Sequence, residues 1–273
     1  MTDTAQGNLQ SMFARAREQG RCALLPYLTA GIPDADASVE IFAAMAQAGA
    51  DGFEVGIPYA DPLMDGPVIM AAGEAALDHG ITVDIALDVI ARVVDRTGKP
   101  VLAMTYVNPV LRHGIDAFFE KASDAGASGV IIADLPVNEA EPFLAAAAAV
   151  GIGLVLFAAP TTDDARLDAV IASEPVFVYA VAEVGVTGER TSASDNIAGL
   201  AARIRSRSDV PIVFGVGIST PEQVALAAPH GDGVIVGTAV VRRVLDAVSG
   251  AEAADEVGRF VRELSIAARG HRT

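Results

Sequence analysis

The segment from residue 53 to 67, FEVGIPYADPLMDGP, places carboxylates where chemistry is possible. Glu54 interrupts an apolar run that otherwise has the composition of a buried strand. Because side chains alternate along a strand, Glu54 shares one face with Gly52 and Gly56, and we expect these glycines to leave room beside its carboxyl group. A desolvated carboxyl group has a raised pKa, which suits proton transfer near neutral pH. The alternative, a structural glutamate paired with a buried base, finds no obvious inward lysine or arginine on the predicted strands.

The residues after this strand, YADPLMDGP, contain prolines and a glycine that exclude a strand or a long helix. We interpret them as a loop in which Asp65 is a candidate functional carboxylate, although Asp61 and Asp65 are both compatible with a simple turn. Pro62, Leu63 and Met64 place apolar groups at the tip of this loop, which indicates a contact surface. Folding back of Leu63 and Met64 over the protein is the alternative.

Three glycine-rich segments follow the later strands: GVTGER (185–190), GVGIST (215–220) and GTAV (237–240). Two of them lead directly into predicted helix starts. Exposed backbone N–H groups beside a helix N-terminus bind anions, and α/β barrels commonly hold phosphate after their last two strands. The sequence therefore predicts a phosphate site built from backbone amides.

Apolar runs rich in β-branched residues alternate with helical segments along the whole chain. The predicted strands cover 22–28, 52–57, 101–106, 129–134, 153–158, 176–181, 211–216 and 233–238. The predicted helices cover 39–48, 85–94, 116–125, 139–150, 165–172, 197–205 and 221–228. Eight strand–helix units predict an α/β fold of the (β/α)8 TIM-barrel type. A doubly wound open sheet is the main alternative, but YLTAGIPD lacks the G-x-G-x-x-G pattern of its nucleotide-binding loop.

An extra amphipathic helix is expected before the first strand, around residues 9–18. No Gly/Ser-rich linker divides the chain, so we expect one TIM-barrel domain over residues 1–273. Its expected parts are an N-terminal helix (1–20), the barrel (21–269) and a frayed tail (270–273).

Composition limits the possible functions. Hydrophobic residues make up 52% of the 273 residues, which suits a large buried core, and the formal net charge is −16. Such an acidic chain is a poor non-specific partner for nucleic acid or an anionic membrane. Apolar runs are too short to cross a bilayer and residues 1–20 do not resemble a signal peptide, so we expect a cytoplasmic protein. The one cysteine, Cys22, and four scattered histidines offer no metal-ligand spacing.

The segment FEVGIPYADPLMDGP closely resembles a motif of the tryptophan synthase alpha chain family. PYLTAGIPD, MTYVNP, IIADLP, GVTGER and GVGISTPEQV match the family in the same order, so the resemblance covers essentially the whole chain. It implies a TIM-barrel lyase of L-tryptophan biosynthesis that cleaves indole-3-glycerol phosphate reversibly into indole and glyceraldehyde 3-phosphate. This retro-aldol step needs indole C3 protonated and the neighbouring hydroxyl deprotonated, and one carboxyl group can serve both needs.

The resemblance also implies roles for individual residues. Glu54 matches the acid–base glutamate, Asp65 the essential loop aspartate and Tyr179 a tyrosine near the glutamate. Val216 departs from the family pattern, because many relatives have an aromatic residue there. Thr187 matches the threonine of a mobile loop. The residues that match the phosphate site are Gly188, Gly217, Gly237 and Thr238. The apolar positions around the indole ring are matched by Tyr27, Met104 and Ile131.

The family further implies a partner, a pyridoxal-phosphate-dependent beta chain in an α2β2 hetero-tetramer. The implied contact is the loop tip formed by Asp61, Pro62, Leu63 and Met64. No metal or cofactor is implied for this chain, and pyridoxal phosphate is expected only in the beta chain. The alternatives are another phosphate-binding barrel of the same pathway, a free-standing lyase that releases indole without a partner, and a catalytically silent activating subunit.

Overall fold

Eight parallel strands form a closed barrel in the computed structural model, which describes residues 5–182 and 190–269. The strands follow one another around the barrel in chain order, and β8 pairs with β1 to close it. They are β1 (Ala23–Thr29), β2 (Phe53–Gly56), β3 (Val101–Thr105), β4 (Gly129–Ile132), β5 (Gly153–Ala158), β6 (Val178–Val181), β7 (Ile212–Gly215) and β8 (Gly233–Val236). Each lies within two residues of a predicted strand, so the TIM-barrel prediction is confirmed.

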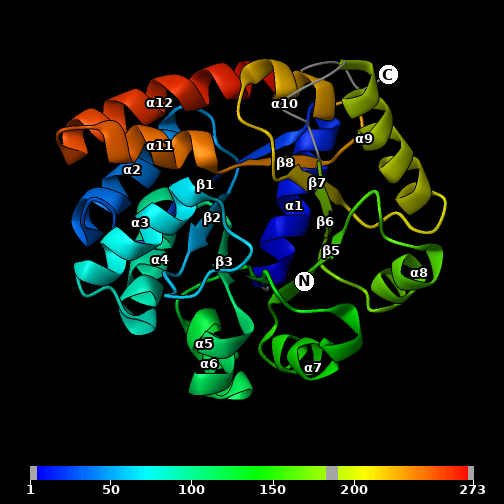
Figure 1. The fold of residues 1–273 in the computed structure, drawn as a ribbon, viewed down its shortest axis with the longest axis horizontal. Coiled ribbons are helices and arrows are strands. Elements are labelled where there is room, and N and C mark those ends of the chain that lie inside the picture. Colours follow the sequence, from blue (N-terminus) through cyan, green and yellow to red (C-terminus); the bar gives the residue numbers. More distant parts are fainter. Residues whose placement is uncertain (1–4, 183–189, 270–273) are drawn as a thin grey trace.

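Helices surround the barrel on its outer face, except for α1, which lies in the middle of the ring in Figure 1. They are α1 (Ala5–Glu18), α2 (Ala35–Gln47), α3 (Pro67–Asp78), α4 (Val83–Thr97), α5 (Val107–His113), α6 (Ile115–Asp124), α7 (Glu141–Val150), α8 (Asp164–Ala172), α9 (Arg190–Arg205), α10 (Pro221–Ala227), α11 (Thr238–Asp246) and α12 (Gly250–Ala267), with a short 3-10 helix η1 (Val137–Glu139) before α7. No helix of the described part of the chain is long and apolar enough to cross a membrane.

The N-terminal helix α1 closes the end of the barrel at which the strands begin. A side chain at Gly52, Gly129 or Gly233, which lie at the starts of β2, β4 and β8, would meet atoms of α1 at 3.0 to 3.5 Å. The atoms concerned belong to Met12 and two other buried apolar side chains of α1, Leu9 and Phe13. The lack of side chains at these glycines therefore makes room for the apolar face of α1. Because α1 covers this end of the barrel, we expect a ligand to bind at the opposite end.

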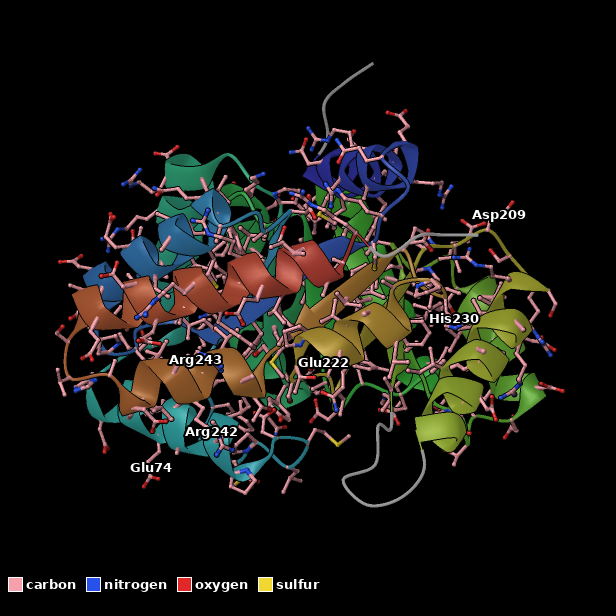
Figure 2. All side chains as sticks on the ribbon, turned by 90° about the horizontal axis from the view of Figure 1, so that it is seen from above. Glu74, Asp209, Glu222, His230, Arg242 and Arg243 are labelled. Atoms are coloured by element: carbon pink, nitrogen blue, oxygen red, sulfur yellow. The ribbon has the colours of Figure 1, made fainter. Side chains whose placement is uncertain are left out.

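Two helices at the C-terminal end of the sequence lie side by side over the outside of the barrel (Figure 2). The guanidinium carbon of Arg243 in α11 lies 3.6 Å from the ring centroid of Phe260 in α12. A cation over an aromatic face contributes about 0.5–1 kcal/mol at partly exposed sites. This contact helps to fix α11, whose N-terminus borders the candidate site.

Three helices were absent from the sequence prediction: α3, α5 and α12. α3 begins at Pro67, which was assigned to the loop. Proline is well tolerated at the first helical position because the N–H group it lacks has no partner there. The loop is therefore shorter than predicted, and Asp65 lies immediately before the N-cap residue Gly66.

Candidate active site

Glu54 lies in the middle of β2 with its side chain inside the barrel. Its neighbour Phe53 points the other way and packs edge-to-face on Phe42 of α2, with ring centroids 5.2 Å apart. Glu54 is 4% exposed, and its Oε2 atom has no hydrogen-bond partner among the described residues. Burial raises the pKa of Glu54 to about 8, and the charge of Asp65 adds to this increase. The carboxyl group is therefore mostly protonated at neutral pH, and the residue forms part of the wall of a cavity described below.

The glycines beside Glu54 do not leave open space next to its carboxyl group, contrary to the expectation from the sequence. A side chain at Gly56 would meet the hydroxyl group of Tyr27 at 2.2 Å, and one at Gly52 would meet Met12 at 3.0 Å. Neighbouring side chains therefore occupy the space beside these glycines, and this close packing holds the strand and the Tyr27 ring in a fixed arrangement.

Asp65 is partly buried in the loop between β2 and α3. The loop is shaped by two tight turns, in which Leu63 N–H donates to Asp61 O and Asp65 N–H donates to Pro62 O, both at 3.0 Å. Burial raises the pKa of Asp65 to about 6, and hydrogen bonding with the Tyr106 hydroxyl group offsets part of the increase. Asp65 is therefore mostly ionised at neutral pH, whereas Glu54 is mostly protonated.

Tyr106 was missed in the sequence analysis. It follows β3 as the N-cap residue of α5, and its hydroxyl group accepts a hydrogen bond of 3.3 Å from the backbone N–H of Met64. The same hydroxyl group interacts with the Asp65 carboxyl group, so one side chain holds both the backbone and the acid of the loop. The motif MTYVNP contains this tyrosine, but its position relative to the loop follows only from the barrel geometry.

Two further tyrosines lie inside the barrel. The hydroxyl groups of Tyr27 and Thr29 are 3.1 Å apart, and the Tyr179 ring stacks on Phe157 of β5 with centroids 4.9 Å apart. Burial raises the pKa of both tyrosines above the ordinary value, so both remain neutral. A side chain at Gly215 would meet the Tyr179 hydroxyl group at 2.1 Å, so this glycine is required by the position of the tyrosine.

Glu54, Asp65, Tyr27 and Tyr179 face a cavity of about 460 Å³ at the C-terminal ends of the strands, whereas Tyr106 lies outside its wall. A cavity of this size is in the usual range for small-molecule sites. The residues singled out from the sequence that line it are Tyr27, Glu54, Met64, Asp65, Met104, Ile131, Tyr179, Val216, Gly217, Gly237 and Thr238. Asp61, Pro62 and Leu63 are not part of the cavity wall, and Thr187 and Gly188 lie outside the described residues.

The two helix starts at the cavity are not equivalent. α10 begins with a capping box in which Gln223 and Thr220 are hydrogen bonded to one another's backbone N–H groups, and the Gln223 side chain also accepts from Ser219 N–H at 2.7 Å. α11 begins at Thr238, and its N-cap residue Gly237 provides no side-chain cap. Of these two helix starts, the start of α11 is therefore the better candidate for binding an anion through backbone N–H groups.

The tip of the loop before α3 is exposed on the rim of the barrel. Leu63 is 81% exposed and Met64 is 66% exposed. Adjacent large apolar side chains at such exposure, next to a cavity, support the interpretation as a contact surface. The folded-back alternative is wrong for Leu63, whereas Met64 also lines the cavity wall.

No group of three or more histidine, cysteine, aspartate or glutamate residues with metal-ligand geometry occurs within residues 5–182 and 190–269. His230, which follows α10 (Figure 2), does not line the cavity, and neither do His79 and His113. At neutral pH a protonated Glu54 is suited to donate a proton, and an ionised Asp65 is suited to stabilise a positive charge.

The fold and the cavity thus define a (β/α)8 barrel with a buried acid at the C-terminal ends of its strands. The profile of the family described as tryptophan synthase alpha chain matches residues 13–269, and the chain belongs to this family. A tryptophan synthase alpha chain of Prochlorococcus marinus (strain MIT 9313) is 41% identical over 261 residues, which are 95% of this chain and 94% of the relative.

Solved structures of the same family are also similar. A structure of Mycobacterium tuberculosis tryptophan synthase matches with a TM-score of 0.86 and 37% identity, over 96% of this chain and 98% of that chain. The tryptophan synthase alpha chain of Legionella pneumophila subsp. pneumophila matches with a TM-score of 0.86 and 29% identity, over 96% and 97% of the two chains.

Proposed function

We propose that this chain is a carbon–carbon lyase that cleaves indole-3-glycerol phosphate reversibly into indole and glyceraldehyde 3-phosphate, as the alpha subunit of a tryptophan synthase. Family membership supports the reaction class. The observation that carries the assignment to particular residues is the buried carboxyl group of Glu54 in the cavity wall, with a pKa raised to about 8.

In the proposed reaction, protonated Glu54 gives its proton to C3 of the indole ring. The carboxylate so formed takes a proton from the hydroxyl group on the adjacent glycerol carbon. The bond between this carbon and C3 then breaks, its electron pair returns to the indole ring, and the carbon becomes the aldehyde of glyceraldehyde 3-phosphate. The proton has moved from the hydroxyl group to C3, and Glu54 ends as it began.

Asp65 has a separate role in this proposal. Protonation of C3 develops positive charge toward the indole nitrogen, and an ionised carboxylate next to that N–H group stabilises the charge. A pKa of about 6 leaves Asp65 ionised at neutral pH. The apolar walls formed by Tyr27, Met104 and Ile131 suit the indole ring, and the start of α11 at Gly237 suits the phosphate group.

The pair of variants Glu54→Gln and Glu74→Gln tests the proposal. Glu74 is exposed on α3, away from the cavity wall (Figure 2). Purified protein is given indole-3-glycerol phosphate, and indole and glyceraldehyde 3-phosphate are quantified. We expect Glu54→Gln to lose about 10²-fold to 10⁴-fold in cleavage rate while Glu74→Gln keeps it. More than a tenth of wild-type activity in Glu54→Gln would remove Glu54 from the acid–base role.

We also propose that the exposed loop tip contacts a beta chain, as the name tryptophan synthase of the relatives implies. The exposure of Leu63 and Met64 supports this assignment. Pyridoxal phosphate is then required only by the partner, and a cytoplasmic location fits the biosynthetic role. A free-standing lyase and a silent activating subunit predict different behaviour when a beta chain is added.

A further inference from the structure

The electrostatics of the cavity oppose the entry of a phosphate ester. The wall carries the ionised carboxyl group of Asp65, and the whole chain has a formal net charge of −16. Among the described residues of the cavity wall, Arg166 is the one with a permanent positive charge. A group that attracts the phosphate dianion is needed before the backbone amides at short range can bind it.

Arg166 belongs to the first turn of α8, at the edge of the cavity next to Thr162 and Val170. Its backbone N–H donates to the N-cap residue Asp163 at 2.8 Å, and its side chain is exposed and forms no salt bridge among the described residues. The guanidinium group is therefore available to a ligand.

The other acids of α8 are occupied by arginines of the neighbouring segment. Arg203 reaches Asp164 at 2.9 Å, and Arg207 reaches Asp168 at 2.6 Å. These two pairs compensate the negative charges nearest to Arg166, apart from the capping carboxylate of Asp163. The positive charge of Arg166 is therefore not neutralised by these two acids, and it attracts anions both in the solvent in front of the cavity and in the cavity itself.

We propose that Arg166 captures the anionic substrate and determines the preference of the cavity for phosphorylated ligands. This inference rests on the proposed function, because it assumes a phosphate ester as the substrate. The phosphate group meets Arg166 on the β5 side of the cavity and then binds at the start of α11, on the β8 side. Arg166 contributes to capture and affinity and takes no part in proton transfer.

The test compares Arg166→Gln and Arg166→Lys with Arg262→Gln. Arg262 is an exposed arginine of α12 that is not part of the cavity wall, so it controls for the loss of one positive charge. We expect Arg166→Gln to lower kcat/KM for indole-3-glycerol phosphate about threefold to tenfold, mainly through KM. Arg166→Lys should restore most of this loss, and Arg262→Gln should resemble the wild type.

Ionic strength separates capture from a structural effect. At about 0.01 M the screening length is roughly 30 Å, and at 1 M it is roughly 3 Å. The difference between wild type and Arg166→Gln should therefore be largest at low salt and nearly vanish at high salt. Calorimetric titration with glycerol 3-phosphate should show the same dependence, and titration with indole should show no difference.

Equal kinetics of Arg166→Gln and Arg262→Gln would overturn the inference, and so would a loss that high salt leaves unchanged. In both cases a wild type that cleaves the substrate leaves the proposed function intact. A wild type without cleavage, combined with weaker glycerol 3-phosphate binding in Arg166→Gln, would overturn the proposed function and support the anion role of Arg166.

Discussion

The charge of Asp65 raises the pKa of Glu54 across the cavity, although burial of Glu54 makes the larger contribution. The two carboxyl groups thus titrate as a coupled pair, with values of about 6 for Asp65 and about 8 for Glu54. Each is kept in the protonation state that its proposed role needs near neutral pH. The two carboxyl groups are chemically similar, but their different environments give them different pKa values and so suit them to two different roles.

The first prediction concerns the pH dependence of cleavage. Activity needs Asp65 ionised and Glu54 protonated, so kcat/KM should rise as pH increases through about 6 and fall as it increases through about 8. The measurement is a pH profile of indole release at substrate concentrations far below KM. A profile that is flat between about pH 5 and pH 9 would exclude this pair as the acid and base.

The second prediction concerns stability. The folded-state pKa of Glu54 is about 8 and its ordinary value is 4.5, so the folded protein retains a proton that the unfolded chain releases. Wild-type stability relative to Glu54→Gln should therefore be greatest below about pH 4.5 and decrease as pH rises to about 8, by a total on the order of 5 kcal/mol. Urea unfolding of both proteins at several pH values measures this. A constant difference across the range would show that Glu54 titrates normally in the folded protein.

The strands of this barrel could be predicted closely because each is a short apolar run bounded by glycine, proline or polar residues. Helix ends were less predictable. α9 begins at Arg190, well before the predicted start at 197. α12 was not predicted at all, although Val257, Phe260, Val261 and Leu264 recur at helical spacing in the sequence and form its buried face. What the structure adds is the partner of this apolar face, which packs against α2 and α11.

The residues of the candidate site also differ in how far the sequence could predict them. Glu54 could be predicted because a carboxylate in an apolar strand is an anomaly along the sequence itself. Tyr106 could not, because a tyrosine at the end of a strand is ordinary and its contact with Asp65 depends on the path of the loop. The occupied start of α10, in contrast, has a sign in the sequence, because Thr220 and Gln223 have the spacing of a capping box whose side chains bind backbone N–H groups.

The third prediction concerns Tyr106. Its hydroxyl group lowers the pKa of Asp65 and binds the backbone of Met64, so Tyr106→Phe should raise the pKa of Asp65 and loosen the loop. We expect the acidic limb of the pH profile to move to higher pH and kcat to fall about tenfold. Tyr59→Phe is the control, because its hydroxyl group accepts from Asn108 at 3.0 Å and its ring lies beside Tyr106. An unchanged acidic limb in Tyr106→Phe would show that the tyrosine does not control Asp65.

The fourth prediction concerns phosphate. Gly237 has φ −105°, and a side chain there would make ordinary contacts of 3.4 Å or more with Tyr27, so substitution does not strain the backbone. Gly217 is unsuitable for this test because its φ is +87°. A substitution there would strain the backbone, and the effect of that strain could not be separated from the effect of the added charge. Gly237→Asp should raise KM for indole-3-glycerol phosphate at least tenfold more than the isosteric Gly237→Asn, because it adds a negative charge where the helix start favours anions. Equal KM values in the two variants would place the phosphate group elsewhere.

The last prediction concerns the partner. Leu63 lies on the exposed tip of the loop that carries Asp65, outside the cavity wall, so a protein bound there would restrict the loop without entering the site. Restricting the loop shifts the population toward conformations in which Asp65 is correctly placed, which couples partner binding to catalysis. We expect low activity for the isolated chain and strong activation on titration with its beta chain.

Leu63→Ala should weaken activation about tenfold while basal activity stays within about twofold, since one buried leucine side chain contributes roughly 1.5–3 kcal/mol to an interface. Ile266→Ala, a change at a 62% exposed apolar residue of α12, should behave as the wild type. Flat activity in the presence of an independently confirmed complex would contradict the coupling, and the absence of any complex would favour the free-standing lyase.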